Sequence, residues 1–222
     1  MMNIIKGRPE NASPDLKEAL RYMGYKGHTP DPDSMMLIEE CKSELLKAVS
    51  PVCCYMYTEI RAISEDETEL VFGKVKSRDL ARHLKGCTGA YLFAATIGIS
   101  VDRLISKYSR IKPAKGVITD ALGSSSIESF CDFAELEITK DITQHCSRFS
   151  AGYGDFSLSH QTDFMRCLDM NRTLGITLSD SLLMTPTKSV TAVIGIGASN
   201  RTCASKCISC PNTKCIYRDS GH

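Results

Sequence analysis

The residues best suited to bind a small ligand form a short run in the last third of the chain. Arg148 is separated by three residues, one of them Ser150, from the pair Gly152 and Tyr153. The guanidinium of arginine is a permanently charged fork of donors that suits a carboxylate or a phosphate. Glycine lets the backbone approach a ligand closely, and tyrosine offers a flat face with a polar tip. The pattern indicates a site for a ligand with a carboxylate and an aromatic or cationic part. The alternative is a turn whose arginine is solvated.

A second chemically active group lies near the C-terminus, where four cysteines fall within the last 20 residues. Four thiolates in a short segment can bind zinc or an iron–sulfur cluster. The first three share the spacing of radical S-adenosylmethionine enzymes, but those enzymes carry it in an early loop of a large barrel, so we do not expect that class. Zinc, an iron–sulfur cluster and an unliganded tail all stay open. The four residues are Cys203, Cys207, Cys210 and Cys215.

The composition and length indicate the class of protein to which these residues belong. A chain of 222 residues with 42% hydrophobic and 24% charged residues is typical of a soluble globular protein with a sizeable core. The formal net charge of +1 gives no reason to expect nucleic acid or an anionic membrane as a partner. No apolar run is long enough to span a bilayer, and the N-terminus has no secretory signal. We expect a cytoplasmic protein without a disulfide framework, although it has 11 cysteines.

Hydrophobic periodicity predicts alternating helices and strands without the regular order of a doubly wound sheet. The longest helix-compatible stretch precedes Arg148, and its centre holds Gly123 and three serines for which a packing or ligand reason is expected. The seven cysteines outside the C-terminal group are expected to be buried thiols, and Cys53, Cys54 and Cys131 among them lie in apolar surroundings. The sequence therefore predicts an α+β fold. Helices are predicted at 14–23 (capped by Ser13), 35–48, 78–84 (capped by Ser77), 101–105 (capped by Ser100), 117–146 and 158–171. Strands are predicted at 52–63, 67–75, 90–99, 175–181 and 189–196.

Taken as a set, these segments resemble the activation domain of cobalamin-dependent methionine synthase. The resemblance spans roughly Ile4 to Gly197 and rests first on the Arg-x-x-x-Gly-Tyr element of that family. It implies a single domain, residues 1–199, with a twisted, largely antiparallel sheet flanked by helices, followed by a Cys-rich tail, residues 200–222. The remaining matching pieces are Arg21–Tyr25, Ala94–Gly98, Ala121–Phe130, Leu174–Ser181, Met184–Pro186 and Ser189–Val190.

The resemblance also implies a ligand, because members of this family bind S-adenosylmethionine. Arg148 would pair with the ligand carboxylate, and backbone groups of Ser150 and Gly152 would hold adenine or ribose edges. Tyr153 would pack near the sulfonium, because cations favour aromatic faces. Glu128 stands at the position of an acidic ligand-site residue and would balance the positive charge. The alternatives are a surface salt bridge for Arg148, a helix-surface carboxylate for Glu128 and a core aromatic for Tyr153.

The family function implied for this chain is reactivation in trans. A cobalamin-bound methionine synthase or another corrinoid protein, oxidised to the inactive cob(II) form, would receive one electron from a flavodoxin- or ferredoxin-like donor. The methyl group would come from S-adenosylmethionine. An iron–sulfur cluster in the cysteine tail would suit such an electron transfer.

The chain also departs from the family pattern. The family's distal Tyr pair is absent here, and Gly154 to Ser157 replace a Pro-rich stretch. These departures favour an alternative, a metal-binding redox or interaction module that keeps the fold without the ligand. An ordinary methyltransferase is disfavoured because no Gly-rich strand-turn-helix loop is present.

Overall fold

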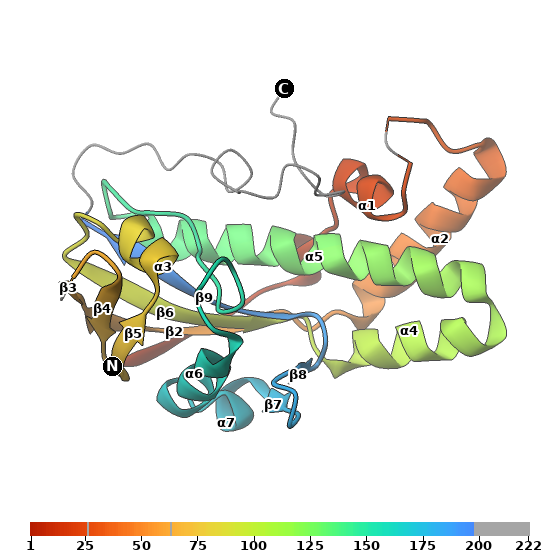
Figure 1. Ribbon diagram of the computed structural model, residues 1–222. Coiled ribbons are helices and arrows are strands. Elements are labelled where there is room, and N and C mark those ends of the chain that lie inside the picture. Colours follow the sequence, from red (N-terminus) through yellow and green to blue (C-terminus); the bar gives the residue numbers. More distant parts are fainter. Residues whose placement is uncertain (26, 63, 198–222) are drawn as a thin grey trace.

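The core of the molecule is a four-stranded antiparallel sheet, as seen in a computed structural model that describes residues 1–197 except 26 and 63 (Figure 1). The strand order is β1-β2-β6-β9, so strands far apart in the sequence become neighbours. β6 is buried along nearly its whole length, which agrees with its continuous run of apolar residues. The strands are β1 (Met2–Lys6), β2 (Val52–Glu59), β6 (Gly89–Thr96) and β9 (Ser189–Ile196).

Both faces of this sheet are covered, and each face has its own hydrophobic core. In β2, Cys53 belongs to the core on one face and Cys54 to the core on the other, as the alternation of side chains in a strand requires. Four helices and a 3-10 turn cover the first face. They are α1 (Leu16–Tyr22), α2 (Pro32–Ala48), α4 (Ile99–Ile111) and α5 (Pro113–Thr139), together with the 3-10 turn η1 (Pro9–Ala12).

Short elements contribute to the core on the second face (Figure 1). They come from two parts of the chain, the segment between β2 and β6 and the segment between α5 and β9. The first segment holds β3 (Arg61–Ala62), β4 (Glu67–Leu70), β5 (Gly73–Lys76) and α3 (Arg78–His83). The second holds η2 (Leu158–His160), α6 (Gln161–Cys167), α7 (Met170–Leu174), β7 (Thr177–Leu178) and β8 (Met184–Thr185).

The expected α+β class with a largely antiparallel sheet is confirmed, and several local expectations are corrected. Strand β1 was not predicted. The stretch 67–75 is a hairpin, β4 and β5, and not one strand. Helix α4 begins after Gly98, whose φ of 92° suits glycine, so Ser100 lies inside the helix and does not cap it. Helix α5 ends at Thr139 because the residues that follow pair with β9 instead of continuing the helix.

The small residues at the centre of α5 have a packing role. The hydroxyl of Ser125 donates to the backbone oxygen of Asp15, and that of Ser126 donates to the backbone oxygen of Ala12. Both acceptors lie in the segment from η1 to α1, which packs directly against the helix. Ser125 and Ser126 therefore hold the N-terminal segment against α5, and their presence in the helix needs no ligand to explain it.

Five of the seven cysteines expected to be buried are buried, among them Cys53, Cys54 and Cys131, whereas Cys87 and Cys167 are partly exposed. Burial raises the pKa of the Cys53 thiol to about 12 and that of Cys54 to about 11, and burial also raises the pKa of Cys131. At neutral pH these groups remain protonated, and they act as small apolar side chains.

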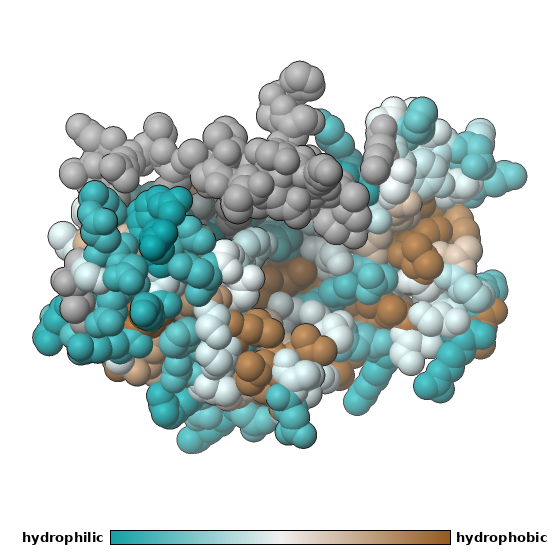
Figure 2. All heavy atoms as spheres, in the orientation of Figure 1, coloured by the Kyte–Doolittle hydropathy of each residue, from teal (hydrophilic) through white to brown (hydrophobic). Residues whose placement is uncertain are grey.

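The surface of the molecule is uneven in polarity. Figure 2 shows hydrophilic side chains gathered over α3 and the sheet of β3, β4 and β5, and apolar side chains at the surface elsewhere. Ile111 at the end of α4 and Val117 near the start of α5 are exposed apolar residues. Among the described residues, no helix is both long enough and apolar enough to cross a membrane.

Candidate functional site

The segment that carries Arg148 is held along the free edge of β9. The backbone N–H of Phe149 donates to the oxygen of Val193 at 2.9 Å, and the N–H of Val193 donates back to Phe149 at 2.8 Å. Three residues earlier in the chain, the N–H of Cys146 donates to the oxygen of Gly195 at 2.7 Å. These bonds extend the sheet by a short irregular strand, so the backbone on which Arg148 stands is fixed by the sheet.

The guanidinium of Arg148 is buried among three carboxylates of α5. Arg148 is only 5% exposed. Its Nη1 lies 2.5 Å from Glu135, and its Nη2 lies 2.7 Å from Asp132 and 3.3 Å from Glu128. Residues 128, 132 and 135 share one face of a helix, because four and seven residues correspond to about one and two turns. The structure thus brings Arg148 and Glu128 together as partners in an ion pair, and it excludes a solvated arginine.

Asp132 and Glu135 were not anticipated as members of this cluster. The sequence feature that could have predicted this cluster is the acidic repeat at 128, 132 and 135 on the longest helix. An arginine follows 13 residues after the last of these carboxylates. Three carboxylates against one guanidinium leave the cluster with two excess negative charges. Glu135 is nearly buried, whereas the Asp132 side chain is 70% exposed, so part of this negative charge faces solvent.

Gly152 and Tyr153 form a tight turn directly after the arginine. Gly152 has a φ of 95°, which a residue with a side chain rarely adopts. Its N–H donates to the oxygen of Phe156 at 2.7 Å, and the N–H of Tyr153 donates to the oxygen of Ser150 at 3.1 Å. Tyr153 is 53% exposed, with its ring centroid 6.3 Å from that of Phe149. Tyr153 is therefore a surface aromatic residue and not a core residue.

The far end of the turn is tied to the start of α3 by Asp155. Its carboxylate accepts from the Ser77 hydroxyl at 2.6 Å and from the N–H groups of Arg78 and Asp79 at 2.9 and 3.1 Å. The hydrogen bond from Ser77 is the main reason why the pKa of Asp155 is lowered. Asp155 thus assists Ser77, the expected cap, in satisfying the unpaired N–H groups of the helix.

Replacing Asp155 with alanine is expected to lower the free energy of unfolding by about 1 kcal/mol at pH 7, the usual effect of losing a helix cap. Because folding lowers the pKa of this carboxyl, its stabilisation is present above the pKa of the unfolded chain and is lost as the pH falls through the folded value. The difference between wild type and variant should therefore shrink below about pH 4. Urea denaturation at several pH values measures it, with the exposed Asp180→Ala as the control. A difference that stays constant down to pH 2 would contradict this role.

The motif pieces near the end of the chain also meet in space. Thr96 at the end of β6 pairs with Ser189 at the start of β9, and their hydroxyl oxygens lie 2.9 Å apart. The ammonium of Lys188 lies 2.8 Å from Asp120 and 2.9 Å from the Ser124 hydroxyl, both on α5. The segment that leads into β9 is therefore fixed to the same helix that supplies the carboxylates of Arg148.

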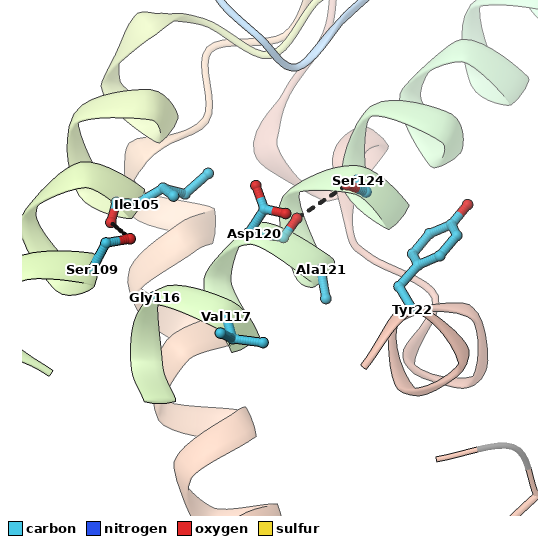
Figure 3. A pocket seen from close by; sticks show the side chains of 8 residues that line it. All are labelled: Tyr22, Ile105, Ser109, Gly116, Val117, Asp120, Ala121 and Ser124. Carbon is cyan, nitrogen blue, oxygen red and sulfur yellow. Dashed lines mark hydrogen bonds between the residues drawn. The ribbon is translucent and has the colours of Figure 1, made fainter. Parts of the chain in front are cut away.

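A surface groove of about 660 Å³ lies elsewhere on the same helix (Figure 3). Tyr22 of α1 stands on one side, and residues of α4 and α5 form the other. None of the five residues expected to bind a ligand lines it. Its lining residues are Tyr22, Ile105, Ser109, Gly116, Val117, Asp120, Ala121 and Ser124.

The expected metal ligands Cys203, Cys207, Cys210 and Cys215 lie outside the described residues, as does the predicted boundary at residue 199. Within residues 1–197, leaving aside 26 and 63, no group of three or more Cys, His, Asp or Glu side chains is arranged to hold a metal ion.

Comparison with solved structures shows which known fold this is. The chain superposes on the crystal structure of the MetH reactivation domain bound to AdoHcy with a TM-score of 0.68. The match covers 92% of this chain and 81% of that chain, at 13% sequence identity. No protein-family model matches the sequence, and no curated protein matches it. The likeness therefore establishes the fold, a mixed α+β domain of the MetH reactivation type.

Proposed function

We propose that this protein binds S-adenosylmethionine and acts in trans in the reactivation of a cobalamin-dependent methionine synthase or a related corrinoid protein. The observation that carries the proposal is the ion pair of Glu128 with Arg148, which stands four residues before Gly152 in the sequence, in a chain with the fold of a reactivation domain. That solved domain holds AdoHcy, which is S-adenosylmethionine without its methyl group. A methyl donor is what a methylation of cobalamin requires.

The charges of the cluster suit this ligand. S-adenosylmethionine carries a carboxylate, an ammonium and a sulfonium, so its net charge is positive. A ligand carboxylate can replace one of the three carboxylates now on Arg148, and Asp132 is the most exposed of them. The released carboxylates then face the ammonium and the sulfonium, and Tyr153 offers an exposed aromatic face to a cation. The excess negative charge favours the sulfonium ligand over its neutral thioether product.

In this proposal the protein supplies binding and position, while cobalamin on the partner carries the methyl chemistry. Cobalamin on the partner, reduced by a one-electron donor of the flavodoxin or ferredoxin type, would supply the nucleophile that accepts the methyl group, and S-adenosylhomocysteine would be the leaving group. The chain's own residues hold the donor so that its methyl group faces the partner. The protein is therefore an accessory of a methyltransferase system.

One observation favours the second candidate, an interaction module that keeps the fold without the ligand. The guanidinium of Arg148 already has three carboxylate partners, so a ligand must compete with them. The distal Tyr pair of the family is also absent. Under this candidate the Arg148 cluster is purely structural.

Titration calorimetry with S-adenosylmethionine separates the two candidates. We expect the wild type to bind, and Arg148→Lys to bind at least about tenfold more weakly, because lysine keeps the charge but loses the two-point contact with a carboxylate. Arg166→Lys is the matched control, since Arg166 is exposed and pairs with Asp163 on α6. Absence of binding by the wild type removes the first candidate. Equal binding by wild type and Arg148→Lys removes the role given to Arg148.

The charge argument has its own test in the same assay. Glu128→Gln should weaken binding of S-adenosylmethionine more than binding of S-adenosylhomocysteine, because only the first carries the sulfonium charge. An equal loss for both ligands would show that Glu128 does not face that charge. Reactivation itself is tested with a corrinoid protein in the cob(II) form, whose recovery should require this chain, S-adenosylmethionine and a one-electron donor together.

A further inference from the structure

Two cysteines from distant parts of the chain lie in contact at one end of the sheet. The sulfur atoms of Cys87 and Cys146 are 3.7 Å apart. Cys87 follows α3, while Cys146 belongs to the segment along β9 that continues to Arg148, so 59 residues separate them in the sequence. Cys87 is partly exposed, whereas Cys146 is only 4% exposed. A reagent in solvent can therefore reach the first thiol, while the second is shielded behind it.

The backbone fixes both cysteines beside the last residues of β9. The N–H of Cys146 donates to the oxygen of Gly195 at 2.7 Å, and the N–H of Cys87 donates to the oxygen of Leu84 at 3.0 Å. A Cβ added to Gly195 would stand 2.6 Å from the sulfur of Cys87 and 3.6 Å from the Cβ of Cys146. Glycine at this position therefore leaves the space in which the Cys87 sulfur reaches Cys146.

Helix α3, which precedes Cys87, holds the Arg148 segment on both sides of the arginine. Before Arg148, the thiol of Cys146 donates to the backbone oxygen of His83 at 3.5 Å, and the Nε2 of His83 lies 2.8 Å from the backbone oxygen of Ser147. After Arg148, the carboxylate of Asp155 accepts from the first residues of the helix. A covalent bond between the two sulfur atoms would therefore lock the start of a segment whose end is already capped onto α3.

The two thiols are placed to form a disulfide without a change of fold. A disulfide needs its sulfur atoms about 2.05 Å apart. The sulfur atoms of Cys87 and Cys146 already touch, and the remaining gap is of the size that a rotation of a cysteine side chain about χ1 covers. In a chain that otherwise keeps reduced thiols, one such bond is a reversible modification and not part of a disulfide framework.

We propose that Cys87 and Cys146 are a redox-active pair that forms a reversible disulfide by exchange with an oxidised low-molecular-weight disulfide of the glutathione class. The thiolate of the exposed Cys87 attacks one sulfur of that disulfide, whose other half leaves as a thiol. The Cys146 thiol then gives up its proton and attacks the Cys87 sulfur, which releases the second half. The protein loses two S–H bonds and gains one S–S bond, while the small disulfide takes up two electrons and two protons. The modification does not depend on S-adenosylmethionine binding.

The test is peptide mapping of the full chain after incubation with mixtures of oxidised and reduced glutathione, followed by alkylation. We expect a peptide that joins Cys87 to Cys146, formed in the oxidised mixture and removed by dithiothreitol. Cys146→Ser should stop at the first step and carry glutathione on Cys87, whereas Cys87→Ser should leave the buried Cys146 unmodified. Cys167→Ser is the matched control, because Cys167 is also partly exposed but lies on α6, and it should keep the cross-link.

Hydrogen exchange on the wild type measures the consequence and needs no variant. Oxidation should slow exchange of the N–H groups of Cys146 and Phe149, which bond to β9, at least about tenfold, and leave those of α2 on the other face unchanged. Unchanged exchange in the oxidised chain would remove the locking role. Absence of the joined peptide in the oxidised wild type would overturn the proposal. A disulfide from either cysteine to a different residue, or a metal ion that protects both thiols in the reduced chain, would also overturn it.

Discussion

Replacing Arg148 with alanine is expected to lower the free energy of unfolding by about 3–5 kcal/mol, the effect of removing one partner from a buried ion pair. The variant would leave Glu135, which has only 12% of its side chain exposed, as a nearly buried carboxylate without its guanidinium. Asp132 and Glu128 are more exposed and can turn to water, so most of the loss comes from Glu135. Urea denaturation monitored by circular dichroism measures the change.

Two comparisons make this result specific to the buried cluster. Arg166→Ala removes an exposed arginine from a pair with Asp163 and should change stability by less than about 1 kcal/mol. The double variant Arg148→Ala with Glu135→Ala should recover part of the loss, because the buried charge is then gone. A loss of under 1 kcal/mol for Arg148→Ala alone would show that the cluster is hydrated and open. In that case the competition between carboxylates and ligand would also be weak.

Replacing Phe130 with alanine is expected to cost about 3–5 kcal/mol, the range for truncating a fully buried aromatic side chain. Phe130 is 0% exposed and belongs to the core between the helices and the sheet. Its ring lies against Gly7, where an added Cβ would stand 2.6 Å from the ring. Phe130 thus sets the distance between α5 and the sheet, and this distance in turn sets the position of the carboxylates of Glu128 and Asp132.

Leu136→Ala on the same helix is the matched control, because Leu136 is 68% exposed. It should change stability by no more than about 0.5 kcal/mol. If S-adenosylmethionine binds, Phe130→Ala should also weaken binding, since the carboxylates would no longer be held opposite Arg148. A stability loss below 1 kcal/mol would contradict the anchoring of α5 by this residue.

The segment that carries Arg148 is held at both of its ends. Cys146 stands two residues before Arg148, and its backbone N–H is bonded to the edge of β9. The segment is tied down again at Asp155, beyond the Gly152 turn, where the carboxylate accepts from Ser77 at the start of α3.

Some elements could be predicted from the sequence because their signals are local. The apolar run of β6, most of helix α2 and the cap Ser77 depend on residues close in the chain. The hairpin of β4 and β5 was read as one strand, since the turn at residues 71 and 72 has no strong turn signal before Gly73. Strand β1 was missed because it is an edge strand in which three of the five residues are exposed.

The sequence by itself determined the α+β class, the buried cysteines and the Arg148, Gly152, Tyr153 element, because residue types and short spacings decide them. The tertiary structure alone decided the partners of these residues. Arg148 meets Glu135 and Asp132 only because α5 packs over the sheet while the segment after it turns back along β9. Cys87 meets Cys146 only because both flank the end of that strand. Such contacts depend on the pairing of distant strands, which no local spacing in the chain records.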